Sequence, residues 1–178
     1  SINSTNWRLD TNLTNLKADF IKGGFVTLQG EPLKDIDLSN SQPCLLGNFF
    51  DCMDNLLVKF PKLINAYQYP TLNKNDVDIQ QFIKLSGDGK IYDYICEKTG
   101  WDRPLAKNNF IRIMFSKAGW NSVYKKRWKE LFPNVIGWMD EFKEKNNSHK
   151  ELAIMLQRLE SEIFIKNIYP KIRKQGYI

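Results

Sequence analysis

Apolar residues recur at three- and four-residue spacing along most of this 178-residue chain, a periodicity that predicts helices. The last predicted helix begins with Ser148 and Glu151 in the spacing of a capping box, and Pro170 is expected to kink it or end its regular part. Between the second and third helices, Pro70 and Asn73 predict a loop over residues 61–74. The predicted helices cover residues 7–24, 43–60, 76–85, 91–99, 102–119, 122–131, 135–145 and 148–174.

Strand patterns are confined to two short runs, residues 25–28 and 33–38, which are joined by the turn sequence QGEP. They predict an antiparallel hairpin. We therefore expect an α+β protein that is predominantly helical, with one small hairpin at about 25–38 and helices around it.

The helix at 102–119 combines clear end signals with an unusual face. Asp102 can cap its start and Gly119 is a natural stop. At four-residue spacing, two cations are followed by two apolar groups. Such a face suits a ligand with a triphosphate at one end and a base and sugar at the other; the alternative is a solvated face, because like charges one turn apart mildly repel. The four residues are Arg103, Lys107, Ile111 and Phe115.

The second predicted strand ends in IDLSNSQP, where Asp35 and Asp37 lie on the same side of the strand. A carboxylate at the exit of a strand, before a polar turn, is a common ligand of a divalent cation. The polar sequence at 39–41 also predicts a helix cap before Pro43. Both interpretations can hold together, because capping leaves Asp37 free.

Composition adds three constraints. Apolar residues make up 42% and aromatic residues 13% of the chain, which argues for a folded protein. With 26 basic and 20 acidic residues, the net charge of +6 favours a polyanionic partner such as nucleic acid. No CxxC pair, signal peptide or apolar run of about 18 residues occurs, so we expect an intracellular protein with no membrane segment. The aromatics at 120–138 predict core packing more readily than base stacking.

Four short motifs occur along the chain in one order, and together they resemble the palm and fingers of family A DNA polymerases, the DNA polymerase I type, in a divergent phage or mobile-element branch. The first three are the palm-opening motif, the metal-binding strand and the fingers helix, and the fourth is the palm glutamine. The palm-opening motif is matched by Arg8-Leu9 with Thr11 and Asn15-Leu16, and the metal-binding strand by Asp37, Ser39 and Gln42. The fingers helix is matched by Arg103, Lys107, Ile111 and Phe115-Ser116, and the palm glutamine by Gln157.

The resemblance implies a template-directed nucleotidyltransferase that uses primer–template DNA and deoxynucleoside triphosphates in the cytoplasm of a bacterial or phage-infected cell. It implies a first palm part at 1–60, helical fingers at 61–145 and a returning palm helix at 146–178. The family's second catalytic carboxylate is expected just past Ile178, so we expect the isolated 178-residue chain to be inactive.

The resemblance also assigns roles to residues. Asp37 and the Leu38 carbonyl are expected to ligate two Mg²⁺ ions for phosphoryl transfer. Arg103 and Lys107 are expected to hold the triphosphate, with Lys107 as a possible proton donor to pyrophosphate.

Further contacts are implied with the base pair, the sugar and the DNA. Ile111 and Phe115 are expected to face the nascent base pair, Gln42 to lie under the sugar, and Arg8 and Gln157 to touch the minor groove of the primer–template.

Several positions depart from the family pattern, so sugar selection and fidelity are open. Gln42 replaces a Glu, Ile111 an aromatic residue, Phe115 a Tyr, Ser116 a Gly, and Ala153 an Asn. Two alternatives stay open as well: a basic helical nucleic-acid-binding or interaction module without chemistry, and a relative of single-subunit RNA polymerases.

Overall fold

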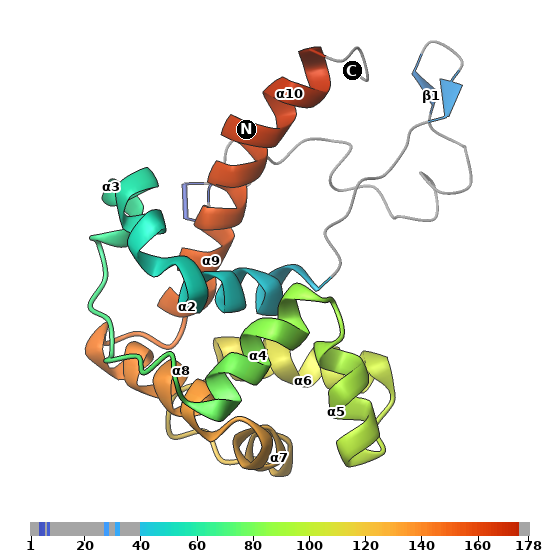
Figure 1. Ribbon diagram of the computed structural model, residues 1–178, viewed down its shortest axis with the longest axis vertical. Coiled ribbons are helices and arrows are strands. Elements are labelled where there is room, and N and C mark those ends of the chain that lie inside the picture. The colour runs from blue at the N-terminus through green and yellow to red at the C-terminus, as the bar shows by residue number, and fades with distance from the viewer. Residues whose placement is uncertain (1–3, 6, 8–26, 29–30, 33–39, 175–178) are drawn as a thin grey trace.

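The computed structural model describes residues 4–5, 7, 27–28, 31–32 and 40–174, and this part of the chain is predominantly helical, as predicted (Figure 1). Its elements, in chain order, are β1 (Thr27–Leu28), β2 (Glu31–Pro32), α2 (Ser41–Lys59), α3 (Pro61–Ile64), α4 (Val77–Gly87), α5 (Ile91–Thr99), α6 (Arg103–Phe115), α7 (Val123–Leu131), α8 (Pro133–Lys145), α9 (Glu151–Ser161), η1 (Glu162–Ile168) and α10 (Tyr169–Lys174).

The predicted palm hairpin at about 25–38 is not supported. The described part of this stretch forms only a two-residue antiparallel ladder, with Thr27 opposite Pro32 and Leu28 opposite Glu31. Glu31 and Pro32 therefore pair within the sequence that was predicted to be the connection. Residues 33–39, predicted as the second strand and its exit, lie outside the described residues. A pairing this short has little stability of its own.

One hydrophobic core joins the helices from α2 to α9. Its centre is aromatic: the rings of Phe50 and Trp138 meet edge to face with centroids 4.9 Å apart, and those of Phe110 and Trp128 are 5.0 Å apart. Trp128, Phe132 and Trp138 are buried, which confirms that these aromatics serve packing. Each such contact adds roughly 0.5–1.5 kcal/mol to the effect of burial.

Helix α2 is buried in its first half and half-exposed in its second. Residues Leu46, Phe49 and Phe50 have no solvent exposure, whereas Val58 is 81% exposed. The backbone leaves helical geometry at Cys52 (φ −118°, ψ 26°), and this kink separates the two halves. The helix is therefore less completely buried than its apolar sequence predicts.

The first half of α2 crosses α4 at Gly47, which is buried against Ser86. A Cβ built at Gly47 would lie 2.3 Å from Ser86 Oγ. Ser86 is itself held in place, because its hydroxyl donates to the Phe82 carbonyl. The absence of a side chain at Gly47 thus permits the close approach of the two helices.

Two further corrections concern local structure. Residues 61–64 of the predicted loop form the short helix α3, which starts with Pro61 in its first turn, a favourable place for proline. The predicted capping box at Ser148 does not form: α9 begins at Glu151, and the Ser148 hydroxyl accepts a hydrogen bond from Lys150 N instead.

The C-terminal helical segment extends away from the other helices as a long arm (Figure 1). Pro170 does not end it, because α10 continues through Pro170. The irregularity lies before the proline, where η1 (Glu162–Ile168) has π-helical hydrogen bonding. Two other helix ends have common local features: Gly100 adopts a left-handed conformation (φ 74°) after α5, and the Ser122 hydroxyl caps α7. Within the described residues, no helix is long and apolar enough to cross a membrane.

The crossing of α2 and α4 leads to a stability prediction. Gly47→Ala should lower the free energy of unfolding by about 1–3 kcal/mol, because the added methyl group overlaps with Ser86 Oγ. In a Ser86→Ala background, the same substitution should cost clearly less, since the Oγ atom is gone. Urea denaturation of the four proteins of this double-mutant cycle measures both costs. Equal costs in the two backgrounds would show that the Gly47–Ser86 contact is not the constraint.

Candidate functional site

Helix α6 carries most of the predicted site residues that fall within the described chain. As predicted, Asp102 caps it: its Oδ1 accepts from Leu105 N at 2.7 Å. Pro104 occupies the first turn, where a missing N–H costs nothing. The helix ends at Phe115 rather than near Gly119, because Ser116 turns to an extended backbone (ψ 158°) and its hydroxyl donates to the Ile113 carbonyl at 3.0 Å.

The buried side of α6 determines which side faces solvent. Ala106, Phe110 and Ile113 have no exposed surface and pack into the core. Asn109 is also buried, and its amide nitrogen lacks a hydrogen-bond partner within the described structure. With this stripe inside, the opposite face of α6 is accessible.

The four predicted ligand-facing residues share that accessible side. Arg103 and Lys107 are exposed, Ile111 is half-buried, and Phe115 is 41% exposed, unusual for a large apolar side chain. The structure thus brings a basic half and an apolar half together along one helix face, as the spacing predicted.

Arg103 lies at a junction of three segments. Its guanidinium forms an ion pair with Asp93 of α5 and lies over the ring of Tyr92, with 5.8 Å from Cζ to the ring centroid. Its Nη2 also donates to Asn40 Oδ1 at 3.3 Å. Burial raises the pKa of Tyr92 well above its usual range. The nearby Arg103 guanidinium favours the ionised form and offsets only part of this rise.

Asn40 links the start of α2 to this junction. Its backbone is left-handed (φ 57°, ψ 37°), a conformation that asparagine tolerates. The sequence predicted a helix cap here, but the Asn40 side chain does not cap α2. It donates to the Gly89 carbonyl at 2.6 Å and accepts from Arg103. Asn40 follows Asp37 by three residues in the sequence. Sequence reasoning missed its tertiary role, because both partners are distant along the chain.

Lys107 differs from Arg103 in having no ion pair or side-chain hydrogen bond with any described residue. It lies one turn into α6, where the helix dipole and the nearby Arg103 both contribute positive charge. This end of α6 can therefore attract a polyanion, and Lys107 is the cation with the fewest competing contacts.

Of the other residues predicted to contact substrate, metal or DNA, two lie within the described chain and three do not. Gln42 lies half-buried in the first turn of α2, and Gln157 is half-buried on α9, which packs against both α2 and α6. Asp37, Leu38 and Arg8 lie outside the described residues. Among the residues that the structure does describe, no group of three or more His, Cys, Asp or Glu side chains could hold a metal ion.

Two buried lysines, which the sequence did not single out, secure the end of α6 and the turn after it. Lys143 of α8 is 2% exposed and donates to the Ile113 carbonyl at 2.6 Å. Lys125 of α7 pairs with Asp140 at 2.7 Å and donates to the Ala118 carbonyl. These contacts fix the backbone on both sides of Phe115.

A hollow of about 570 Å³ adjoins the apolar end of α6. Trp120 and His149 contribute flat side chains to it, and Lys117 contributes a charge. Exposed Lys126 and Lys129 of α7 lie around the adjacent hollow, which shares Trp120. Aromatic surface next to flexible cations suits a single-stranded nucleic acid.

Comparison of the chain with protein-family models, curated proteins and solved structures finds no match.

Lys143 leads to a pH prediction. Burial lowers the pKa of Lys143 to about 8, whereas a lysine in the unfolded chain titrates near 10.4. Between these values the unfolded state binds the extra proton, so the free energy of unfolding should rise with pH, by about 1–3 kcal/mol from roughly pH 7.5 to roughly pH 9.5.

Urea denaturation across this pH range tests the prediction. Lys143→Met should remove the rise, and Lys126→Met, which changes an exposed lysine on α7, should keep it. An unchanged pH dependence in Lys143→Met would contradict the assignment.

Proposed function

We propose that this chain is the palm-and-fingers region of a template-directed DNA polymerase of the family A type, and that α6 binds the triphosphate of the incoming deoxynucleotide. The observation that carries the proposal is the position of Arg103. Its guanidinium, at the basic end of the accessible face of α6, is hydrogen-bonded to Asn40, three residues after Asp37 in the sequence. This hydrogen bond joins the candidate triphosphate-binding helix to Asn40, which lies 63 positions earlier in the chain and within the sequence span of the candidate metal-binding motif.

The chemistry of the basic half fits a triphosphate. An arginine fork can bind two phosphate oxygens at once, and a lysine supplies a mobile point charge and a transferable proton. The ion pair of Arg103 with Asp93 does not prevent this, because both side chains are about half-exposed (45% and 62%) and such pairs contribute little. A triphosphate with several negative charges can displace or share this carboxylate.

The apolar half fits the remainder of the substrate. Ile111 and Phe115 present an apolar surface in line with the two cations, at a distance of one and two further turns. Beyond Phe115, the hollow lined by Trp120 and Lys117 provides stacking surface and charge for the unpaired template strand.

The metal and sugar contacts are part of the same proposal. Magnesium ions held by Asp37 and the Leu38 carbonyl would neutralise charge on the transferred phosphoryl group. Gln42 would lie under the sugar and keep the length of the usual glutamate without its charge. Arg8 and Gln157 would contact the duplex. The division into palm (1–60 and 146–178) and fingers (61–145) belongs to this proposal too.

A second candidate function is a nucleic-acid-binding module without chemistry. It is favoured by one observation, the cluster of exposed Lys117, Lys126 and Lys129 around Trp120, which would bind single strands with or without a triphosphate site.

Binding of a deoxynucleoside triphosphate in the presence of primer–template and Mg²⁺ distinguishes the two. Lys107→Ala should weaken triphosphate binding at least about tenfold, because it removes a charge-assisted contact of about 1.5–3 kcal/mol. Asp37→Ala should abolish the dependence on Mg²⁺. Lys84→Ala, which changes an exposed lysine on α4, should bind like the parent protein and serves as the matched control.

The opposite pattern would overturn the polymerase proposal. If DNA binds equally to all variants and the triphosphate binds to none of them, the basic module remains. In that case substitutions of Lys126 and Lys129 should lower DNA affinity and reduce its salt dependence.

A further inference from the structure

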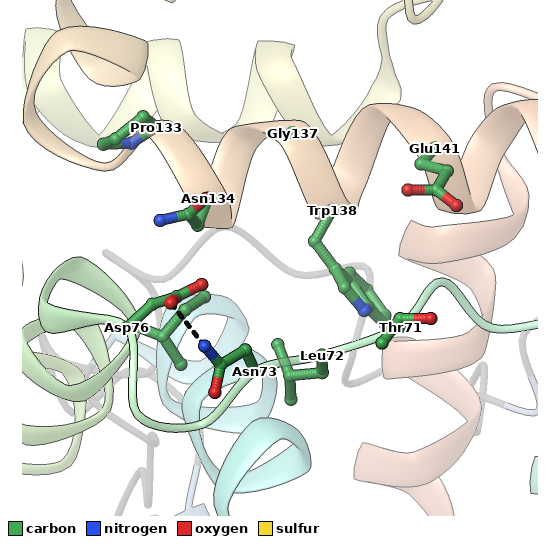
Figure 2. A pocket seen from close by; sticks show the side chains of 10 residues that line it. Thr71, Leu72, Asn73, Asp76, Pro133, Asn134, Gly137, Trp138 and Glu141 are labelled. Carbon is green, nitrogen blue, oxygen red and sulfur yellow. Dashed lines mark hydrogen bonds between the residues drawn. The ribbon is translucent and has the colours of Figure 1, made fainter.

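A separate cleft lies between the segment before α4 and helix α8 (Figure 2), and none of its lining residues belongs to α6. Its volume is about 320 Å³, within the range of small-molecule sites. One wall is the segment from Thr71 to Asp76, and the other is the side of α8 that carries Asn134, Trp138 and Glu141 (Figure 2).

The polar groups of this cleft are mainly acceptors. The amide nitrogen of Asn73 donates a hydrogen bond to Asp76 Oδ1 at 2.7 Å (Figure 2). The amide nitrogen of Asn134 donates to Asp78 Oδ1 at 2.8 Å. The second carboxylate oxygen of Asp76 and the amide oxygen of Asn134 then remain, with no hydrogen bond to another described residue. A ligand that brings donors to this end would satisfy these two oxygen atoms.

The charge of the lining points to a cation. Among the described residues, Asp76 and Glu141 line the cleft and no lysine or arginine does so, although the whole chain carries a net charge of +6. Lys74 lies in the same segment, but its Nζ donates to the Asp51 carbonyl at 2.8 Å. Glu141 has one weak partner, Lys145, at 3.4 Å on the same helix, and both side chains are well exposed. The cleft is thus a local acidic site on a basic protein.

Trp138 provides an independent sign of an unfilled site. The residue is only 4% exposed, and its indole N–H is buried without a hydrogen-bond partner within the described structure. In Figure 2 its ring extends from α8 toward Thr71 and Leu72 between the two walls. A buried unpaired donor costs roughly 1–3 kcal/mol, a cost that a water molecule accepting from it would recover.

The two carboxylates lie at opposite ends of the cleft, with apolar groups between them (Figure 2). Asn134, beside Asp76, and Glu141 are seven residues apart on α8, which corresponds to about 10 Å along the helix. Gly137 lies between them and leaves the wall open, since a Cβ there would meet no atom within 4 Å.

We propose that this cleft binds an aliphatic diamine or polyamine. One ammonium group donates to Asp76 and Asn134, the other donates to Glu141, and the methylene chain lies along Leu72 and Trp138. Two charge-assisted contacts separated by apolar surface select this class over a monoamine or an anion. The inference is independent of the proposed polymerase function, because it uses none of the residues on the accessible face of α6.

Calorimetric titration of the full chain with putrescine, cadaverine and spermidine tests the proposal. At least one of them should bind, and butylamine, which has a single ammonium group, should bind at least about tenfold more weakly. Asp76→Asn and Glu141→Gln should each reduce the affinity about tenfold or more. Glu130→Gln, which removes an exposed carboxylate from α7, should leave the affinity unchanged.

A variant that fills the cleft without destabilising the fold separates loss of the binding site from loss of folding. Gly137→Leu places a side chain in the cleft and should stabilise α8, because glycine is a poor helix former. It should abolish diamine binding with no loss of thermal stability. Absence of binding by all three amines, equal binding of butylamine, or unchanged binding in Gly137→Leu would each overturn the proposal.

Discussion

The rotation of α6 about its own axis is the constraint on which the candidate site depends. Phe110 fixes it, because its ring lies among three other rings, with centroid distances of 6.2 Å to Phe82, 6.4 Å to Tyr92 and 5.0 Å to Trp128. Removal of a buried phenylalanine from such a cluster costs roughly 3–5 kcal/mol, so this orientation is strongly preferred. The accessible face with Arg103 and Lys107 is the geometric consequence.

Three buried charged groups complete this positioning, and each bonds to backbone at or just beyond the end of a helix. Asp78 accepts from Asn134 N at 2.8 Å and so satisfies the start of α8, while Lys143 binds the last turn of α6. Lys125 does the same for the following turn, with Asp140 to balance its charge. These contacts are specific in direction, whereas apolar packing is not, and they fix where Phe115 and Trp120 lie relative to the core.

Local signals in the sequence predicted most of the helices. The periodicity of apolar residues predicted α4 to α8 within a few residues, and Asp102 caps α6 as expected. The single helix predicted over 148–174 is divided into α9, η1 and α10. The spacing of Arg103, Lys107, Ile111 and Phe115 also predicted their shared face, because helix geometry alone determines it.

Long-range contacts were beyond prediction from one sequence. Several polar contacts join segments that are far apart in the chain: those of Asn40 with Gly89 and Arg103, of Asp78 with α8, and of Lys143 with α6. A single polar residue gives no periodic signal in the sequence, so these contacts could not be predicted from it. The hairpin failed for a different reason: the described pairing joins Thr27 and Leu28 to Glu31 and Pro32, which belong to the predicted QGEP connection and not to the second strand-like run. The roles of Leu38 and Arg8 rest on the resemblance alone, and that of Asp37 rests on the resemblance and on its position at the exit of the predicted strand.

The central claim is that a metal bound at Asp37 lies next to the basic end of α6. Paramagnetic broadening of backbone amide signals by Mn²⁺, added with a deoxynucleoside triphosphate, tests it directly. The account predicts that signals of Asn40 and of residues 103–107 broaden strongly while those of the distal part of α8 do not, and that Asp37→Ala abolishes the effect. Broadening that is uniform over the chain, or that persists in Asp37→Ala, would contradict it.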